Sequence, residues 1–141
     1  MFSKRTQYAL RAIMYLAINS SSKKKIGVNV IAEELKVPKQ FLSKILQELV
    51  KHKIVGSSKG KYGGFFLTKR NLNNNLRSII EVFDGNSIFK ECVMGLPECS
   101  SENPCPLHDI TAIYRKELID RLDKKPISKI AEQILKEGLS I

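Results

Sequence analysis

All three cysteines of this 141-residue chain lie within one short stretch. Six residues separate Cys92 from Cys99, five separate Cys99 from Cys105, and His108 follows three positions after Cys105. Thiolate and imidazole groups are the ligands that zinc, copper and iron centres favour in proteins. We therefore predict a metal or cluster site built from these four side chains.

The same stretch is rich in residues that prevent regular structure: Gly95, Pro97, Pro104 and Pro106. Proline removes a backbone donor and fixes one torsion angle, so helices and central strands are excluded here. The loop must then be ordered by something other than backbone hydrogen bonds. A bound metal centre would supply that order, whereas three idle thiols would not.

A redox enzyme that uses these thiols is a poor fit to the sequence. Such enzymes place two cysteines close together, and no CxxC pair occurs here. Apart from His108, His52 is the one histidine that could act as a general base. We expect a protein that is not an enzyme and has no small-molecule substrate.

The positive charge of the chain is concentrated in one half. Residues 1–70 contain 15 Lys and Arg against 3 Asp and Glu, whereas residues 71–141 contain 9 against 11. A solvated surface would not need such an excess, but phosphate groups would match it, because binding releases condensed counterions. A membrane surface fits less well, since no basic amphipathic helix stands alone. The basic half predicts contact with double-stranded DNA.

Nothing in the sequence indicates a membrane or secreted protein. No apolar stretch approaches the length of a membrane span. Arg11 interrupts the apolar part of the N-terminal stretch, and no cleavage pattern of small residues follows it. An odd number of cysteines disfavours a disulfide framework. We expect a cytoplasmic protein.

The basic half has the spacing of a helix-turn-helix. Apolar residues at steps of three and four predict helices over residues 6–19 and 30–36, with Asn29 as the N-cap of the second. Pro38 ends that helix and begins a third over residues 38–51. The polar face of the third helix carries the side chains that we expect nearest to DNA: Lys39, Gln40, Ser43 and Lys44.

A predicted hairpin follows the helix pair. Residues 54–58 and 65–68 read as two strands, and the glycine-rich segment KGKYGG lies between them. A solvated hairpin is the plain alternative, but the helix pair and the charge favour a winged helix-turn-helix. The tip of this wing, which we expect to reach the minor groove or the DNA backbone, is formed by Lys59, Gly60, Lys61 and Tyr62.

The second half of the chain predicts three more helices. Asn75 can cap a helix over residues 76–83, and Ser128 can cap a last helix that Gly138 closes. Between them, residues 107–122 form a longer helix with an apolar stripe that is as suited to a second subunit as to an intramolecular core: Leu107, Ile110, Tyr114, Leu118 and Leu122.

These elements give a mainly α protein with a small β-hairpin wing. We expect a winged helix-turn-helix domain over residues 1–85, a cysteine loop over residues 86–106, and a dimerisation helix with a C-terminal helix over residues 107–141.

The chain resembles the IscR and NsrR family of bacterial iron-sulfur transcription regulators. The order of elements, the wing sequence KGKYGGF and the cysteine stretch with its PCPLH segment carry the resemblance, which covers nearly the whole chain. Its most specific part is the combination of this wing with three cysteines and that segment.

The resemblance implies a homodimer that binds a palindromic operator and acts as a repressor. It makes Cys92, Cys99 and Cys105 thiolate ligands and gives His108 the place of the histidine ligand. A 2Fe-2S cluster needs two ligands on each iron, and these four side chains meet that count, so we favour it over a 4Fe-4S cluster. Family members sense cluster, iron, redox or nitric oxide status.

Zinc is the alternative to iron and sulfide. Three cysteines and one histidine form a good tetrahedral set for Zn²⁺, and the spacing does not separate the two centres. The corresponding alternative function is a winged-helix DNA-binding regulator, stabilised by zinc or free of any cofactor, that does not sense a cluster.

Overall fold

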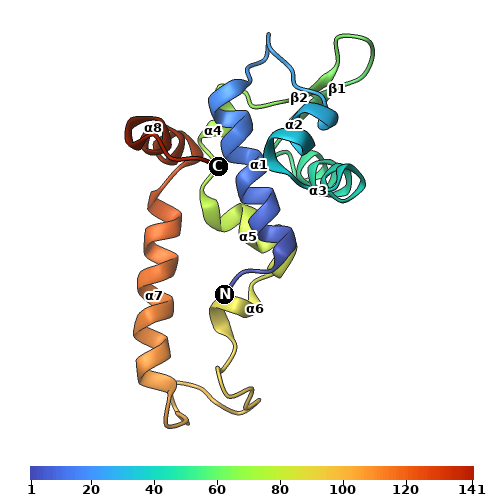
Figure 1. The fold of residues 1–141 in the computed structure, drawn as a ribbon. Coiled ribbons are helices and arrows are strands. Elements are labelled where there is room, and N and C mark those ends of the chain that lie inside the picture. Colours follow the sequence, from blue (N-terminus) through green and yellow to red (C-terminus); the bar gives the residue numbers. More distant parts are fainter.

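The structure, a computed structural model, describes residues 1–141. Helices dominate it, and one antiparallel hairpin lies near its upper edge (Figure 1). The elements in chain order are α1 (Lys4–Asn19), α2 (Val28–Leu35), α3 (Lys39–Lys51), β1 (Gly56–Ser58), β2 (Gly64–Phe66), α4 (Lys69–Leu72), α5 (Leu76–Asp84), α6 (Ser87–Lys90), α7 (His108–Lys124) and α8 (Ile127–Glu137).

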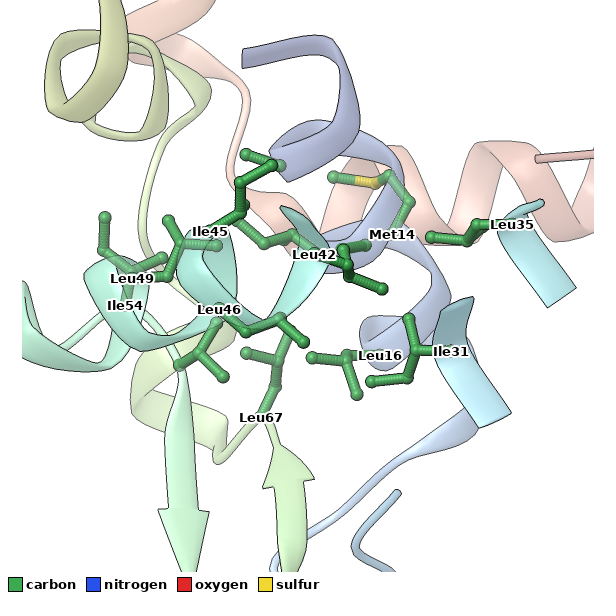
Figure 2. Close-up of a cluster of buried hydrophobic side chains, with 14 of the residues drawn as sticks. Met14, Leu16, Ile31, Leu35, Leu42, Ile45, Leu46, Leu49, Ile54 and Leu67 are labelled. Atoms are coloured by element: carbon green, nitrogen blue, oxygen red, sulfur yellow. The ribbon is translucent and has the colours of Figure 1, made fainter. Parts of the chain in front are cut away.

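The apolar spacing of the basic half produces the expected helix pair. Helices α2 and α3 pack against each other and against α1, and the apolar face of α3 points into the core (Figure 2). Burial of this face removes apolar area from water, which is the main favourable term in folding. The side chains of α3 that it buries are Leu42, Ile45, Leu46 and Leu49.

The turn between α2 and α3 contains a strained residue. Lys36 ends α2 in the left-handed conformation, with φ at 52°, a position that glycine usually takes. Pro38 then serves as the N-cap of α3, one position before its first helical residue. Helix α3 therefore begins at Lys39, with its polar face free of the core.

The wing is shorter than expected and has a third extended segment beside it. Strands β1 and β2 pair in register with Ser57 opposite Phe65. On the other edge, Ile26 exchanges two backbone hydrogen bonds with Phe65, of 2.9 and 2.8 Å. Ile54 and Leu67, which flank the strands, are buried in the core and anchor the hairpin to α3 (Figure 2).

Two predicted N-caps, Asn29 and Ser128, are wrong. Helix α2 begins at Val28 with Gly27 as its N-cap, so Asn29 lies inside the helix and caps nothing. The pairing of Ile26 with the sheet fixes the direction of the chain, and the helix starts directly after it.

Helix α8 likewise begins before Ser128, at Ile127, after Pro126 as N-cap. Ile127 is fully buried, and its N–H donates to the carbonyl of Asn74 at 2.9 Å. Burial of this side chain, rather than a side-chain cap, therefore sets where the helix begins.

Asn75 does cap α5 as predicted, because its side chain accepts a hydrogen bond of 2.9 Å from the N–H of Ser78.

Helix α7 stands along one side of the molecule and buries none of its residues (Figure 1). Helix α8 returns to the body and packs against α1, where Ile127 joins the main core. None of the helices has both the length and the apolar character needed to cross a membrane.

We predict that Gly64→Ala destabilises the wing. Gly64 has a φ of 147°, and a Cβ there would lie 2.7 Å from the backbone of Ile26. Both effects oppose any side chain, so we expect the free energy of unfolding to fall by about 2 kcal/mol. Urea unfolding followed by circular dichroism measures this change.

Gly27→Ala is the matched control. The φ of Gly27 is −70°, and a Cβ at this residue would meet no atom within 4 Å. The weaker N-cap and the lower entropy of the unfolded chain oppose each other there, so we expect little net change in stability. Equal losses in the two variants would show that the close approach of Gly64 to Ile26 is unimportant.

Candidate metal centre and nucleic-acid interface

The cysteine loop connects the end of α6 to the start of α7. Residues 91–107 form turns and bends without a helix or strand, as the prolines predict. The first part of the expected loop differs, because residues 87–90 form the short helix α6, whose Phe89 is buried. The loop lies at the opposite end of the molecule from the wing (Figure 1).

The loop brings the three cysteine sulfurs together. All three Sγ atoms lie within 4.8 Å of one another, and those of Cys92 and Cys105 are 3.6 Å apart. Each of the three residues is half-buried, and none forms a disulfide. Side chains that are up to 13 positions apart in sequence therefore converge at one point.

His108 is the first residue of α7 and contacts this group from one side. Its Nδ1 atom is 3.2 Å from the sulfur of Cys99. The histidine does not lie within 4.8 Å of all three sulfurs. The three sulfurs thus form one group, and His108 joins it through Cys99.

These spacings fit a metal centre. Two thiolates on one tetrahedral metal ion lie roughly 3.8 Å apart, and a thiolate and an imidazole lie roughly 3.6 Å apart, given the usual bond lengths. The observed distances of 3.6 and 3.2 Å are close to both values. A cavity of about 330 Å³ borders Cys99 and Cys105, so the ligand atoms are accessible.

Backbone N–H groups surround the sulfurs and tune their protonation. The N–H groups of Leu96 and Met94 and the thiol of Cys105 lower the pKa of Cys92 to about 7, against desolvation. The N–H of Cys105 donates to the sulfur of Cys99 at 3.4 Å, which favours a thiolate. Desolvation and the two neighbouring thiols outweigh it and raise the pKa of Cys99. Hydrogen bonds to sulfur of this kind are typical of thiolate ligands.

Arg115 is a residue at this site that the sequence pattern did not single out. It lies on α7, and its guanidinium donates to the carbonyls of Lys90 and Glu91, directly before the first cysteine. Its spacing was a usable signal, because His108, Thr111 and Arg115 share one face of a helix. The partners of the guanidinium are backbone atoms, which no sequence pattern reveals.

The predicted DNA-contacting side chains of α3 share its outer face. Lys39, Gln40 and Lys44 are exposed, and Ser43 is half-buried. The side-chain amide of Gln47 donates to the Ser43 hydroxyl at 3.4 Å and so belongs to the same face.

The predicted wing residues lie at the tip of the hairpin. Lys59, Gly60 and Lys61 are exposed, and Tyr62 is 85% exposed. The ammonium group of Lys61 lies 5.7 Å from the centre of the Tyr62 ring. An aromatic ring this open to solvent has no structural role within the chain, and with its cationic neighbour it suits a nucleic-acid surface.

The sequence has clear relatives among transcriptional regulators. Residues 2–133 match the Rrf2 family, described as iron-dependent transcriptional regulators. An HTH-type transcriptional regulator of Aquifex aeolicus is 37% identical over 110 residues, which cover 77% of this chain and 75% of that protein. The HTH-type transcriptional repressor NsrR of Streptomyces coelicolor is 26% identical over 113 residues, covering 80% of this chain and 72% of that protein.

Two solved structures share the fold. CymR, the global cysteine regulator of B. subtilis, superimposes with a TM-score of 0.76 at 19% identity, over 94% of this chain and 97% of that one. T. potens IscR superimposes with a TM-score of 0.74 at 19% identity, over 100% of this chain and 93% of that one. The expected fold class, mainly helical with a hairpin wing, is confirmed.

We predict that Cys92 is the most reactive thiol of the reduced, metal-free protein. Its pKa of about 7 means that its thiolate population grows as the pH rises through neutrality, whereas Cys99 stays protonated. Alkylation by iodoacetamide, followed by peptide mass spectrometry on either side of neutrality, should modify Cys92 before Cys99. Equal rates at the two residues would contradict this ordering.

Proposed function

Because the chain belongs to the Rrf2 family of iron-dependent transcriptional regulators, we propose that it represses transcription as a homodimer whose operator binding is tuned by an iron-sulfur cluster. The resemblance to the IscR and NsrR regulators is confirmed by these relatives, which are regulators and not enzymes. The observation that carries the proposal is the grouping of the three cysteines beside His108.

The number and type of the ligands support a 2Fe-2S cluster. Three thiolates and one imidazole supply two ligands for each of two irons. The same four side chains would also suit Zn²⁺, and the description of the family as iron-dependent favours iron. When bound, such a cluster supplies a centre that reacts to iron supply, oxidants or nitric oxide.

The DNA interface follows from the exposed cations. In this proposal helix α3 enters the major groove, where Gln40 and Ser43 read bases and Lys39 and Lys44 contact phosphates. The wing then reaches the flanking minor groove with Tyr62 and its lysines. Twofold symmetry requires half-sites roughly 34 Å apart, which is a palindromic operator.

The exposed face of α7 supports the homodimer. Ile110 and Ile113 are 69% and 70% exposed, and Tyr114 is 52% exposed. The three lie on neighbouring turns of one helix, so they form one apolar surface. An apolar stripe of this size on a monomer marks an interface. A second copy of α7 would bury it and would set the distance between the two recognition helices.

Ligation of the loop couples the state of the metal centre to operator binding. When the four side chains are held by one centre, residues 91–107 are fixed against the start of α7. When they are released, the loop retains the few hydrogen bonds that it makes on its own, such as the 2.9 Å bond from the N–H of Gly95 to the carbonyl of Cys92. The first turns of α7 then lose a constraint, which changes the dimer geometry and the operator affinity.

We predict that protein purified without oxygen is brown and contains iron and sulfide. Removal of the iron by a chelator should change the footprint on operator DNA, because the dimer geometry depends on the ligated loop. Colourless protein that contains zinc and no sulfide would support the zinc alternative instead. An unchanged footprint would disprove the coupling while leaving the cluster in place.

His108→Ala tests the fourth ligand in the same preparation. Loss of His108 leaves the proposed cluster with three protein ligands instead of four, so the visible spectrum should change and the iron content should fall. A spectrum identical to that of the unmodified protein would remove His108 from the site.

We predict that Ile113→Asp converts the dimer to a monomer. A carboxylate cannot be buried in an apolar interface without a partner, so the interface should open and operator affinity should fall at least tenfold. Sedimentation velocity measures the change in mass. Lys116→Asp is the control, because Lys116 is exposed and lies outside the apolar stripe on the same helix. A dimer that persists in Ile113→Asp would show that α7 is not the interface.

A further inference from the structure

Arg115 makes the contacts that join the two ends of the cysteine loop. One Nη atom donates to the carbonyl of Lys90 at 2.8 Å and to that of Glu91 at 2.7 Å. The Nε and the other Nη donate to the backbone carbonyl and the hydroxyl of Thr111, at 3.2 and 3.1 Å. The guanidinium thus connects the residue before Cys92 to the first turns of α7.

Thr111 completes this connection at the other end. Its hydroxyl lies 2.9 Å from the carbonyl of Leu107, and its N–H donates to the same carbonyl at 3.1 Å. Leu107 is the last residue of the loop and the N-cap of α7. The two chain ends of the loop are therefore linked through one arginine and one threonine.

The environment of Arg115 differs from that of other arginines in this half of the chain. Arg77 pairs with Glu81 and Asp123, and Arg121 pairs with Glu117. Arg115 is half-buried and forms no ion pair. Its N–H groups donate instead to backbone carbonyls and to the Thr111 hydroxyl. A charged donor gives each of these hydrogen bonds more strength than a neutral one would. A cation that only solvates the surface would not need this set of hydrogen bonds.

We infer that Arg115 is a positioning residue for the metal centre, which it serves by fixing Cys92 relative to Cys105 and His108. This inference rests on the proposed ligand set. Cys105 and His108 adjoin the start of α7, whereas Cys92 is separated from them by the whole loop. The bonds from Arg115 to Lys90 and Glu91 hold the chain beside Cys92, so less conformational entropy is lost on ligation.

The planar fork of arginine is what this role requires. A lysine at this position would keep the charge, but its ammonium group is a point donor that cannot link Thr111 to both carbonyls. Partners that orient a ligand without touching the metal typically contribute about 10-fold to 100-fold in metal affinity. We expect Arg115→Ala to lower metal affinity by a factor in this range, and Arg115→Lys to lower it less.

The experiment is an anaerobic titration of the reduced, metal-free protein with Co²⁺. Thiolate-to-cobalt charge-transfer absorption reports ligation by cysteine whichever metal the protein carries in the cell. We expect Arg115→Ala to weaken Co²⁺ binding at least tenfold, and Thr111→Val to weaken it by a smaller factor. Hydrogen exchange of the metal-free protein should be faster at Glu91–Gly95 in Arg115→Ala.

Arg121→Ala is the matched control for this titration. Arg121 lies on the same helix, is 73% exposed and pairs only with Glu117 of its own helix, so its loss should leave Co²⁺ affinity unchanged. An unchanged thermal unfolding midpoint in metal-free Arg115→Ala excludes a general loss of folding. If Arg115→Ala bound Co²⁺ as tightly as the unmodified protein, the inference would be wrong. Unmodified protein without charge-transfer absorption would disprove the ligand set itself.

Discussion

Helix α1 packs against α3, α5 and α8 at once, and this packing determines how the rest of the protein is arranged. Its N-cap, Ser3, is tied to the end of α5, since the N–H of Ser3 donates to Asp84 at 3.0 Å. Further along, Arg11 donates to the carbonyl of Leu35, at the end of α2. Helices α3 and α8 thus both pack against α1, which fixes their positions relative to each other.

Helix α7 is the exception, because it buries none of its side chains. Near its C-terminus, Asp123 accepts a hydrogen bond of 3.0 Å from Arg77 on α5, and Ile127 follows in the core. At its N-terminus it meets the cysteine loop. A helix without buried side chains can tilt at one end while the other stays fixed, at small cost to the core. The cysteine loop adjoins the N-terminal half of α7, which carries the exposed Ile110, Ile113 and Tyr114. Arg115 makes the contacts there that resist such a tilt.

The parts of this structure that local chemistry determines were predictable from the sequence. The apolar spacing of α3 and the side-chain cap of Asn75 are local, and both predictions are confirmed. The caps assigned to Asn29 and Ser128 are wrong, because sheet pairing and burial of Ile127 set those helix starts.

The candidate site divides in the same way. Cysteine spacing predicted that the ligands gather, but the distances of 3.6 Å between Cys92 and Cys105 and 3.2 Å between Cys99 and His108 depend on how the loop folds. The role of Arg115 was hidden for a related reason. Its partners are main-chain carbonyls, and these are the same whatever residues occupy positions 90 and 91.

The junction of the two loop ends has an evolutionary consequence. Because Glu91 and α7 are bonded to each other through Arg115, the residues between them form a loop whose two ends lie at one place. The entropic cost of closing such a loop grows only with the logarithm of its length. Insertions and deletions between the cysteines therefore alter the ligand geometry while the two ends of the loop stay bonded to each other.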